Sequence, residues 1–305
     1  MIMLSIIVPC FNEEESIDLF YGETIKYIDD FEIIFVDDGS KDNTLEKIKN
    51  LCNEHDTVQY ISFSRNFGKE AALYAGLKYS KGDYVAIMDV DLQDPPNLLP
   101  EMLETLQNGE YDIVATRRVN REGEPKIRSL FARLFYRLIN GISDLELVDG
   151  ERDYRLMTRQ VANSLLELPE YNRFSKGLFN WIGFKTKWIE YENIERAHGE
   201  STWSFWGLVK YSIEGILAFT TLPLQISTVM GIIFSIMAFI MLIFVIARKL
   251  MFSDPVAGWT STICVILFLG GIQLFSIGIL GRYIEKIYLE SKNRPIYIIE
   301  ETNID

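Results

Sequence analysis

The chain has 305 residues, enough for one large or two ordinary domains, and 48% of them are apolar, which supports a sizeable core. Its net charge of −13 argues against nucleic acid as the main partner, because such a partner requires a basic surface. The three cysteines lie far apart, so the sequence predicts neither a disulfide framework nor a zinc site. The first residues contain no basic segment and no small-residue cleavage site, which indicates a first strand and not a secretory signal.

The first 115 residues alternate short apolar runs with longer segments of helical character. Strands are expected at residues 4–8, 32–36, 58–62, 84–88 and 113–115. Helices are expected between them, at residues 14–29, 43–53, 69–80 and 97–107. This alternation predicts an α/β fold with a mostly parallel sheet and helices on both faces.

Polar residues follow four consecutive predicted strands, in the segments "PCFNEEE", "VDDGSKDNT", "SRNFGKE" and "DVDLQDPP". The carboxyl ends of parallel strands meet at one edge of the sheet, and open α/β sheets bind their ligands there. For the second segment, turn and helix-capping chemistry is an equally good explanation. Together, the four segments predict a ligand site at this edge.

The fourth segment carries the strongest signal. An apolar run ends at Asp89 and Asp91, and the prolines Pro95 and Pro96 prevent the strand from continuing. Two carboxylates at this position repel each other unless a cation lies between them, and hard oxygen ligands suit Mg²⁺ or Mn²⁺. The sequence contains neither a Walker-type phosphate loop nor a glycine-rich dinucleotide fingerprint. A nucleotide is therefore expected to be held by carboxylates and a metal ion.

Two uncharged runs, residues 224–247 and 256–281, lie near the carboxyl end. As helices each would span roughly 35 Å, which exceeds the hydrocarbon core of a bilayer at about 30 Å. We predict two transmembrane helices; the alternative is a pair of buried core helices. The positive-inside evidence is mixed, but the missing signal peptide predicts a multi-pass protein of the cell membrane with a cytoplasmic catalytic domain.

Two amphipathic stretches lie between the α/β region and the uncharged runs. Residues at about 125–142 form a basic amphipathic helix typical of a membrane surface, or an ordinary helix packed on the domain. Residues 201–222 are rich in aromatic side chains and predict a second interfacial helix. The predicted organisation is a catalytic domain over 1–200, this interfacial segment, and a membrane domain over 223–305 that ends in a short cytoplasmic tail.

The segments "VPCFNEEES", "FVDDGSKDNT", "SRNFGKEAAL" and "DVDLQDPP" closely resemble family 2 glycosyltransferases, which have the GT-A fold. The resemblance continues in "GERDYRLMTR", "NRFSKG" and "RAHGESTW" and includes the two predicted spans, so it covers nearly the whole chain. Within the family, the sequence is similar to the polyprenyl-phosphate glycosyltransferases, the group of dolichol-phosphate mannose synthase and the bactoprenol glucosyltransferases.

The resemblance implies a nucleotide-sugar site at the strand ends. The first nucleotide-binding turn would comprise Pro9, Asn12 and Glu13. The carboxylate of Asp38, beside Gly39, would contact the nucleoside, and Lys69 would belong to the same donor site. The metal ion and the diphosphate would be held by Asp89, Asp91 and Gln93.

The resemblance also implies catalytic and phosphate-binding residues. Arg117 would lie near the diphosphate and the acceptor, and Asp153 matches the acidic residue usually given the base role. A phosphate monoester is mostly dianionic at neutral pH, so Asp153 could instead orient the acceptor or its basic neighbours, or be a structural ion-pair partner. Further basic positions near the phosphates are Arg173, Lys176 and Arg196. Many relatives have a lysine where this chain has Thr202, so Lys176 or Arg196 would have to replace that contact.

The expected function is therefore an inverting, metal-dependent transfer of a sugar to undecaprenyl or another polyprenyl phosphate, with glucose and UDP as the expected sugar and nucleotide. One alternative is a processive polysaccharide synthase, although the Gln-x-x-Arg-Trp motif and the additional spans of that class do not occur in this sequence. The other alternative is a non-catalytic membrane scaffold that binds a nucleotide sugar. A homo-oligomer formed through the spans is compatible with the sequence, which specifies no number of subunits.

Overall fold

The computed structural model describes residues 3–118, 148, 150–191, 217, 219–252 and 258–304. The chain divides into two compact units: Met1–Ser212 together with Arg294–Asp305, and Ile213–Asn293. The predicted basic helix at about 125–142, most of the predicted interfacial segment and Arg196 lie outside the described residues.

Within these residues, the first unit contains an eight-stranded sheet with the order β7-β5-β6-β4-β1-β2-β3-β8. The strands are β1 (Leu4–Cys10), β2 (Phe31–Asp37), β3 (Val58–Phe63), β4 (Tyr84–Ile87), β5 (Ile113–Arg118), β6 (Glu151–Thr158), β7 (Thr186–Tyr191) and β8 (Ile299–Thr302). The centre is parallel, with β1 between β2 and β4 and with β3 beside β2. β5 and β7 also pair in parallel, whereas β6 and β8 run antiparallel to their neighbours. This mostly parallel, mixed sheet confirms the predicted fold class.

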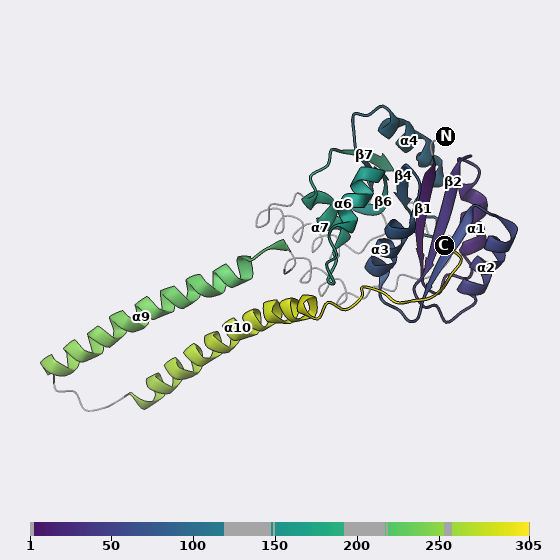
Figure 1. Cartoon of the computed structure of the whole chain (residues 1–305). Coiled ribbons are helices and arrows are strands. Elements are labelled where there is room, and N and C mark those ends of the chain that lie inside the picture. The colour runs from purple at the N-terminus through teal and green to yellow at the C-terminus, as the bar shows by residue number, and fades with distance from the viewer. Residues whose placement is uncertain are drawn as a thin grey trace. The chain divides into compact units, whose positions relative to one another are not determined.

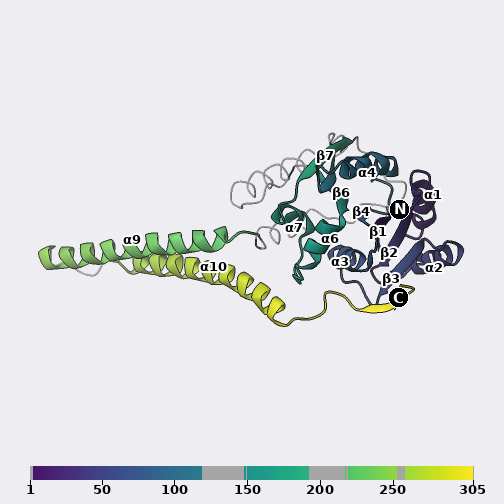
Figure 2. The ribbon, with the colours of Figure 1, turned by 45° about the horizontal axis from the view of Figure 1, so that its top comes forward.

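Helices cover both faces of the sheet (Figure 1; Figure 2). They are α1 (Ile17–Thr24), α2 (Thr44–Glu54), α3 (Lys69–Tyr79), α4 (Leu99–Gln107), α6 (Arg159–Leu166) and α7 (Ser175–Trp181), with a short 3-10 turn, η1 (Pro96–Leu98), before α4. α1 contacts both α2 and η1, and η1 contacts α4, so these elements share one face. α3 contacts α6 on the other face.

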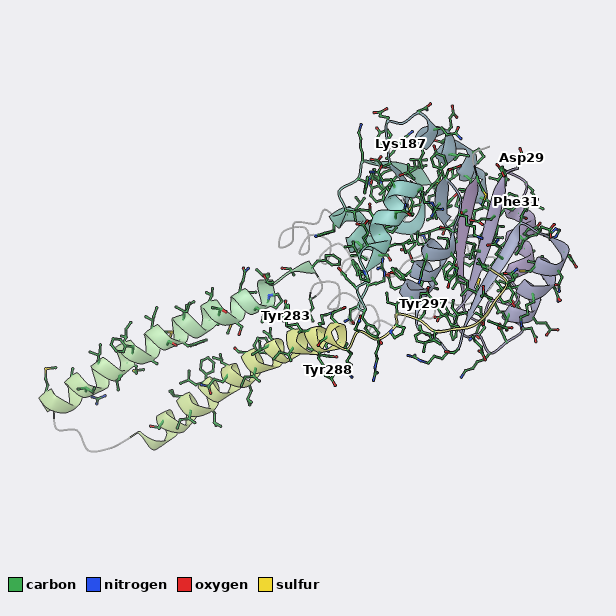
Figure 3. All side chains as sticks on the ribbon, in the orientation of Figure 1. Asp29, Phe31, Lys187, Tyr283, Tyr288 and Tyr297 are labelled. Carbon is green, nitrogen blue, oxygen red and sulfur yellow. The ribbon has the colours of Figure 1, made fainter. Side chains whose placement is uncertain are left out.

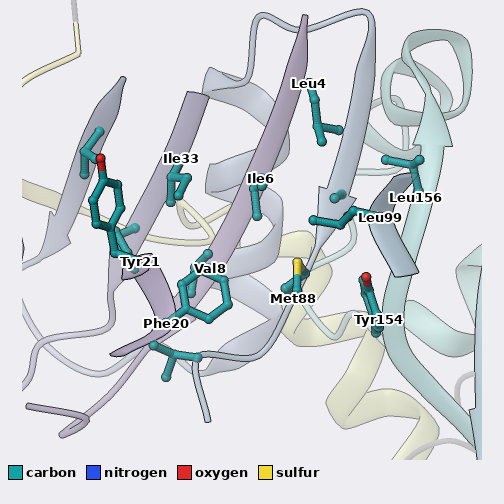
Figure 4. Close-up of a cluster of buried hydrophobic side chains, with 14 of the residues drawn as sticks. Leu4, Ile6, Val8, Phe20, Tyr21, Ile33, Met88, Leu99, Tyr154 and Leu156 are labelled. Atoms are coloured by element: carbon teal, nitrogen blue, oxygen red, sulfur yellow. The ribbon is translucent and has the colours of Figure 1, made fainter. Parts of the chain in front are cut away.

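The core follows from the two-residue period of the strands, which sends alternate side chains to opposite faces. Ile6 and Val8 of β1 lie with Phe20 of α1 in one buried cluster (Figure 4). The intervening Ile7 is buried towards α3. A Cβ atom on Gly76 of α3 would collide with the Ile7 side chain, so glycine allows this helix to approach β1 closely.

The five strands and four helices predicted for the first 115 residues are present, with shifted ends. The largest shift is in α1, which spans Ile17–Thr24 in place of the predicted residues 14–29. Its start is delayed because the backbone N–H of Glu13 donates to Thr44 Oγ1 at the start of α2, and that of Glu14 donates to the Asp42 carboxylate. The elements from β6 to β7 had no counterpart among the predicted ones.

The carboxyl-terminal segment differs from the predicted short tail. β8 pairs antiparallel with β3, and Asn303 accepts the backbone N–H of Tyr60 at 2.7 Å. Tyr297, labelled in Figure 3, stacks on the ring of Phe63 with 4.9 Å between centroids. Residues 294–305 therefore belong to the first unit, because they satisfy the open hydrogen-bonding edge of β3.

The second unit contains two long helices, α9 (Leu222–Phe252) and α10 (Trp259–Ser291), which pack side by side (Figure 1; Figure 2). Within them, Leu222–Arg248 and Val265–Ser291 are long and apolar enough to cross a membrane, and their apolar side chains are exposed. These helices contain the two predicted spans as far as the chain is described. Phe234 and Phe268 meet edge to face between them, with 5.6 Å between ring centroids.

Candidate active site

The loops after β1 and β2 interlock at the carboxyl edge of the sheet. Asn12 donates its backbone N–H to Ser40 Oγ (2.9 Å), and its side-chain oxygen accepts the backbone N–H of Lys41 (2.8 Å). Asn12 adopts a φ of 54°, a left-handed conformation that asparagine tolerates better than most residues. Pro9 lies within β1, opposite Val36 of β2. The predicted first nucleotide-binding turn is therefore a braced loop at the expected edge.

Asp38 braces the next loop. Its carboxylate accepts the backbone N–H groups of Phe67 (2.6 Å) and Gly68 (2.9 Å), immediately before α3. Burial raises the pKa of Asp38, and the two backbone hydrogen bonds oppose this shift. Gly39 has a φ of 69°, and a Cβ atom there would lie 2.5 Å from the carbonyl carbon of Arg65. Both residues thus fix the start of α3, a role that the motif alone did not indicate.

The loop after β4 carries the predicted metal ligands. Asp91 Oδ1 accepts the backbone N–H of Gln93 (3.1 Å), and the Gln93 side-chain oxygen accepts an N–H of Arg152 (3.2 Å). The backbone N–H of Asp89 donates to the carboxylate of Asp94 (3.0 Å). The loop therefore folds back on itself and holds the acidic pair at the end of the strand.

β6 delivers two charged residues to this loop. It runs antiparallel to β4 with Ile87 opposite Arg155, and the same register brings Asp153 alongside Asp89. Successive side chains of β6 point to opposite faces, so Arg152 and Asp153 reach different partners. Arg152 lies 3.6 Å from the buried Asp94, whose pKa is raised to about 7, first by burial and then by Asp89. Neither Arg152 nor Asp94 was among the predicted site residues.

Lys69, the first residue of α3, links the two carboxylates. Its ammonium group lies 2.6 Å from Asp89 Oδ1 and 2.6 Å from Asp153 Oδ2. Lys176 of α7 lies 3.9 Å from the other oxygen of Asp153 and donates to the backbone carbonyl of Glu151 at 3.0 Å. Burial raises the pKa of Asp153, but Lys69 and Lys176 outweigh burial and hold this pKa well below its usual value. Asp153 is therefore held in its ionised form between two cations.

The sequence of the sheet region identifies the family. Residues 5–166, more than half of the chain, match the family model described as glycosyl transferase family 2. The chain belongs to this family. Its GT-A fold agrees with the observed mixed sheet and helical layers.

Relatives extend this assignment beyond the sheet region. This family 2 glycosyltransferase is 42% identical over 304 residues to the SfII prophage-derived bactoprenol glucosyl transferase of Shigella flexneri, and the match covers 98% of each chain. It is 44% identical over 306 residues to CsbB of Bacillus subtilis (strain 168), provisionally named a glycosyltransferase, over 99% of this chain and 92% of that one.

A solved structure gives a more distant likeness. The glucosyl-3-phosphoglycerate synthase of Mycobacterium tuberculosis, crystallised with Mn²⁺, UDP-glucose and phosphoglyceric acid, is 23% identical. The comparison covers 71% of this glycosyltransferase and 78% of that chain, with a TM-score of 0.48.

The ligand set at the end of β4 fits a divalent cation. Asp89, Asp91 and Gln93 offer hard oxygen atoms within one loop, and Mg²⁺ sites typically use one or two protein carboxylates with waters and substrate phosphates. Among the residues that the structure describes, no group of three or more His, Cys, Asp or Glu side chains forms a preassembled metal site. Such a site would depend on diphosphate oxygens for its remaining ligands.

Two predicted phosphate-binding arginines have other partners in the structure. Arg173 donates to the backbone carbonyl of Leu168 after α6, and its guanidinium group lies 4.6 Å from the centre of the Tyr74 ring. Burial lowers the pKa of Arg173. Arg117, on β5, forms an ion pair with Glu190 of the neighbouring β7. The structure therefore brings together Lys69, Asp89, Asp153 and Lys176, but does not show these two arginines among them.

Proposed function

We propose that this enzyme transfers glucose from UDP-glucose to undecaprenyl phosphate or a related polyprenyl phosphate. The relatives named bactoprenol glucosyl transferases, which match along almost the full chain, support the sugar and the lipid acceptor. The observation that carries the proposal is the alternation of charge at the site. Asp89 and Asp153 flank Lys69, and Lys176 lies beyond Asp153, so anionic and cationic groups can engage two phosphate-bearing substrates.

The carboxylates of Asp89 and Asp91, with the oxygen of Gln93, would hold Mg²⁺ or Mn²⁺ against the donor diphosphate. The metal ion would supply a positive charge that stabilises the departing nucleoside diphosphate. Arg152, which already contacts Gln93, adds a permanent positive charge at the same loop. The loop interlock at Asn12 and Asp38 would keep the donor edge in one conformation.

The acceptor chemistry assigns Asp153 an orienting role. The second pKa of a phosphate monoester is about 6, so the acceptor is mostly dianionic at neutral pH and needs no general base. The depressed pKa of Asp153 makes it a weak base. We therefore assign it the task of holding Lys69 and Lys176, whose charges offset the repulsion between the acceptor phosphate and the diphosphate. Direct displacement by a phosphate oxygen would invert the anomeric carbon.

The proposed location is the cytoplasmic face of the cell membrane, with α9 and α10 as two spans. The strand after α10 supports an even number of crossings. β8 pairs with β3 in the same sheet that precedes α9, so the chain must return to the side from which it entered. The proposed division into a catalytic domain, an interfacial segment and a membrane hairpin thus includes residues 294–305 in the catalytic part.

An activity assay tests the proposal. Purified full-length protein would be incubated with Mn²⁺, radiolabelled UDP-glucose and a short polyprenyl phosphate. We expect a lipid-extractable monosaccharide product that forms more slowly in Asp153→Asn and at the wild-type rate in the matched surface variant Asp56→Asn. A long polymer would identify a processive synthase instead, and UDP-glucose binding without turnover would identify a scaffold. A panel of other nucleotide sugars in the same assay tests the choice of donor.

A further inference from the structure

Two pairs of consecutive residues meet beside Asp153. Lys69 and Glu70 begin α3, and Ser175 and Lys176 begin α7. Both lysines approach Asp153, one from each helix. Glu70 and Ser175 form a second link next to this one, although they are 105 residues apart in sequence.

The second link is a multiple hydrogen bond. Both carboxylate oxygens of Glu70 lie 3.1 Å from the backbone nitrogen of Ser175, and the Ser175 hydroxyl group donates to Glu70 as well. Burial raises the pKa of Glu70, hydrogen bonds from Ser175 lower it, and the nearby charge of Asp153 raises it again. Burying a carboxylate costs free energy, and the hydrogen bonds from Ser175 offset part of this cost.

The link between Glu70 and Ser175 also constrains the neighbouring lysine. Lys176 directly follows Ser175, so an anchor on the Ser175 backbone limits where the Lys176 side chain can start. The Lys176 ammonium group then reaches both the Glu151 carbonyl oxygen (3.0 Å) and Asp153 (3.9 Å). Lysine has a long, flexible side chain, so fixing its backbone reduces the range of positions that its ammonium group samples.

We propose that Glu70 is a positioning residue that anchors Ser175 and thereby holds Lys176 against Asp153. Through its neighbour Lys69, the same end of α3 also contacts Asp89, so one helix start aligns the donor-side carboxylate with the lysine that would face the acceptor phosphate. The link to acceptor binding rests on the proposed function; the anchoring of Lys176 does not.

Lysine labelling tests the anchoring without any turnover. Full-length protein would be treated briefly with an acylating reagent, and modification of each lysine would be followed by peptide mass spectrometry. In Glu70→Ala we expect Lys176 to react about fivefold faster, the change that corresponds to losing one ordinary hydrogen bond. The exposed Lys185 serves as an internal reference, and Glu101→Ala on the exposed side of α4 is the matched control variant. An unchanged Lys176 rate in a folded Glu70→Ala protein would overturn the proposal.

The conservative variant separates geometry from charge. Glu70→Gln keeps an oxygen that accepts the Ser175 N–H and gains an amide that donates to the hydroxyl group. We expect Glu70→Gln to restore the slow labelling of Lys176. In the transfer assay, we expect Glu70→Ala to raise the KM for the acceptor but not for the donor, and Glu70→Gln to restore the acceptor KM. If Glu70→Gln labels like Glu70→Ala, the hydrogen-bonded anchor is not what places Lys176. If the wild-type protein transfers no glucose, the proposed function fails, and the labelling result still decides the anchoring.

Discussion

Replacing Lys69 with methionine would remove the cation between Asp89 and Asp153 while keeping most of the side-chain volume. The two carboxylate oxygens share one ammonium group at 2.6 Å each, so they lie at most about 5 Å apart. At an effective dielectric constant of about 20, two unit charges at that distance repel by about 3 kcal/mol. The side chains of Lys69, Asp89 and Asp153 are 40%, 25% and 28% exposed, so solvent reduces this value to about 1 kcal/mol.

A divalent cation at Asp89 would relieve the same repulsion, and in the wild-type protein it must compete with Lys69. We therefore expect Mn²⁺ to bind Lys69→Met about fivefold more tightly than the wild-type protein, the equivalent of about 1 kcal/mol. Thermal unfolding of the detergent-solubilised protein over a Mn²⁺ titration measures this. Glucose transfer should nevertheless fall, because the charge that offsets the two substrate phosphates is gone. Equal or weaker Mn²⁺ affinity in Lys69→Met would refute the assignment of Asp89 to the metal site.

Three further outcomes follow from the structure. Burial raises the pKa of Asp153, but its lysine partners lower it further, so Asp153 stabilises the fold above about pH 4 and loses this effect only as the pH falls through its folded-state value. The rise of kcat/KM near pH 6 should therefore come from ionisation of the acceptor phosphate and not from Asp153, so the wild-type protein and Asp153→Asn should both show it. An acid limb that only the wild type shows would contradict this. Gly39→Ala should destabilise the protein by about 2 kcal/mol or more, because it combines a left-handed φ with a collision against the Arg65 backbone; an unchanged melting temperature would count against that contact. Removal of residues 295–305 should lower the melting temperature and promote aggregation through the open edge of β3, measured by light scattering, and a monodisperse protein of wild-type stability would disprove the bracing role of β8.

Local sequence patterns predicted much of this fold. The apolar runs identified the first five strands, although β4 ends at Ile87, well before Pro95 and Pro96. These features depend on residues that are close together along the chain, so they can be recognised in a single sequence. The resemblance to family 2 then narrowed the predicted α/β fold to the GT-A fold, which the family match and the sheet order confirm.

The contacts that build the site were harder to predict from the sequence, because they join segments that are far apart along the chain. Nothing in the local pattern around Glu151 indicates that β6 inserts antiparallel between β4 and β5, yet this insertion brings Asp153 to Asp89. Likewise, Asp38 and Arg173 are charged residues in motif positions, and only the structure shows that they hold backbone groups. The roles assigned to the site residues stay predictions until variants are measured.

The position of β8 has a consequence for biogenesis. During translation, residues 299–302 leave the ribosome only after both long hydrophobic helices have been synthesised. If α9 and α10 enter the membrane as proposed, the rest of the first unit would therefore wait with β3 uncovered while they insert. In that proposed arrangement, β8 would complete the sheet only after insertion. A chain whose helices fail to insert would keep an unpaired strand edge that chaperones and proteases can recognise.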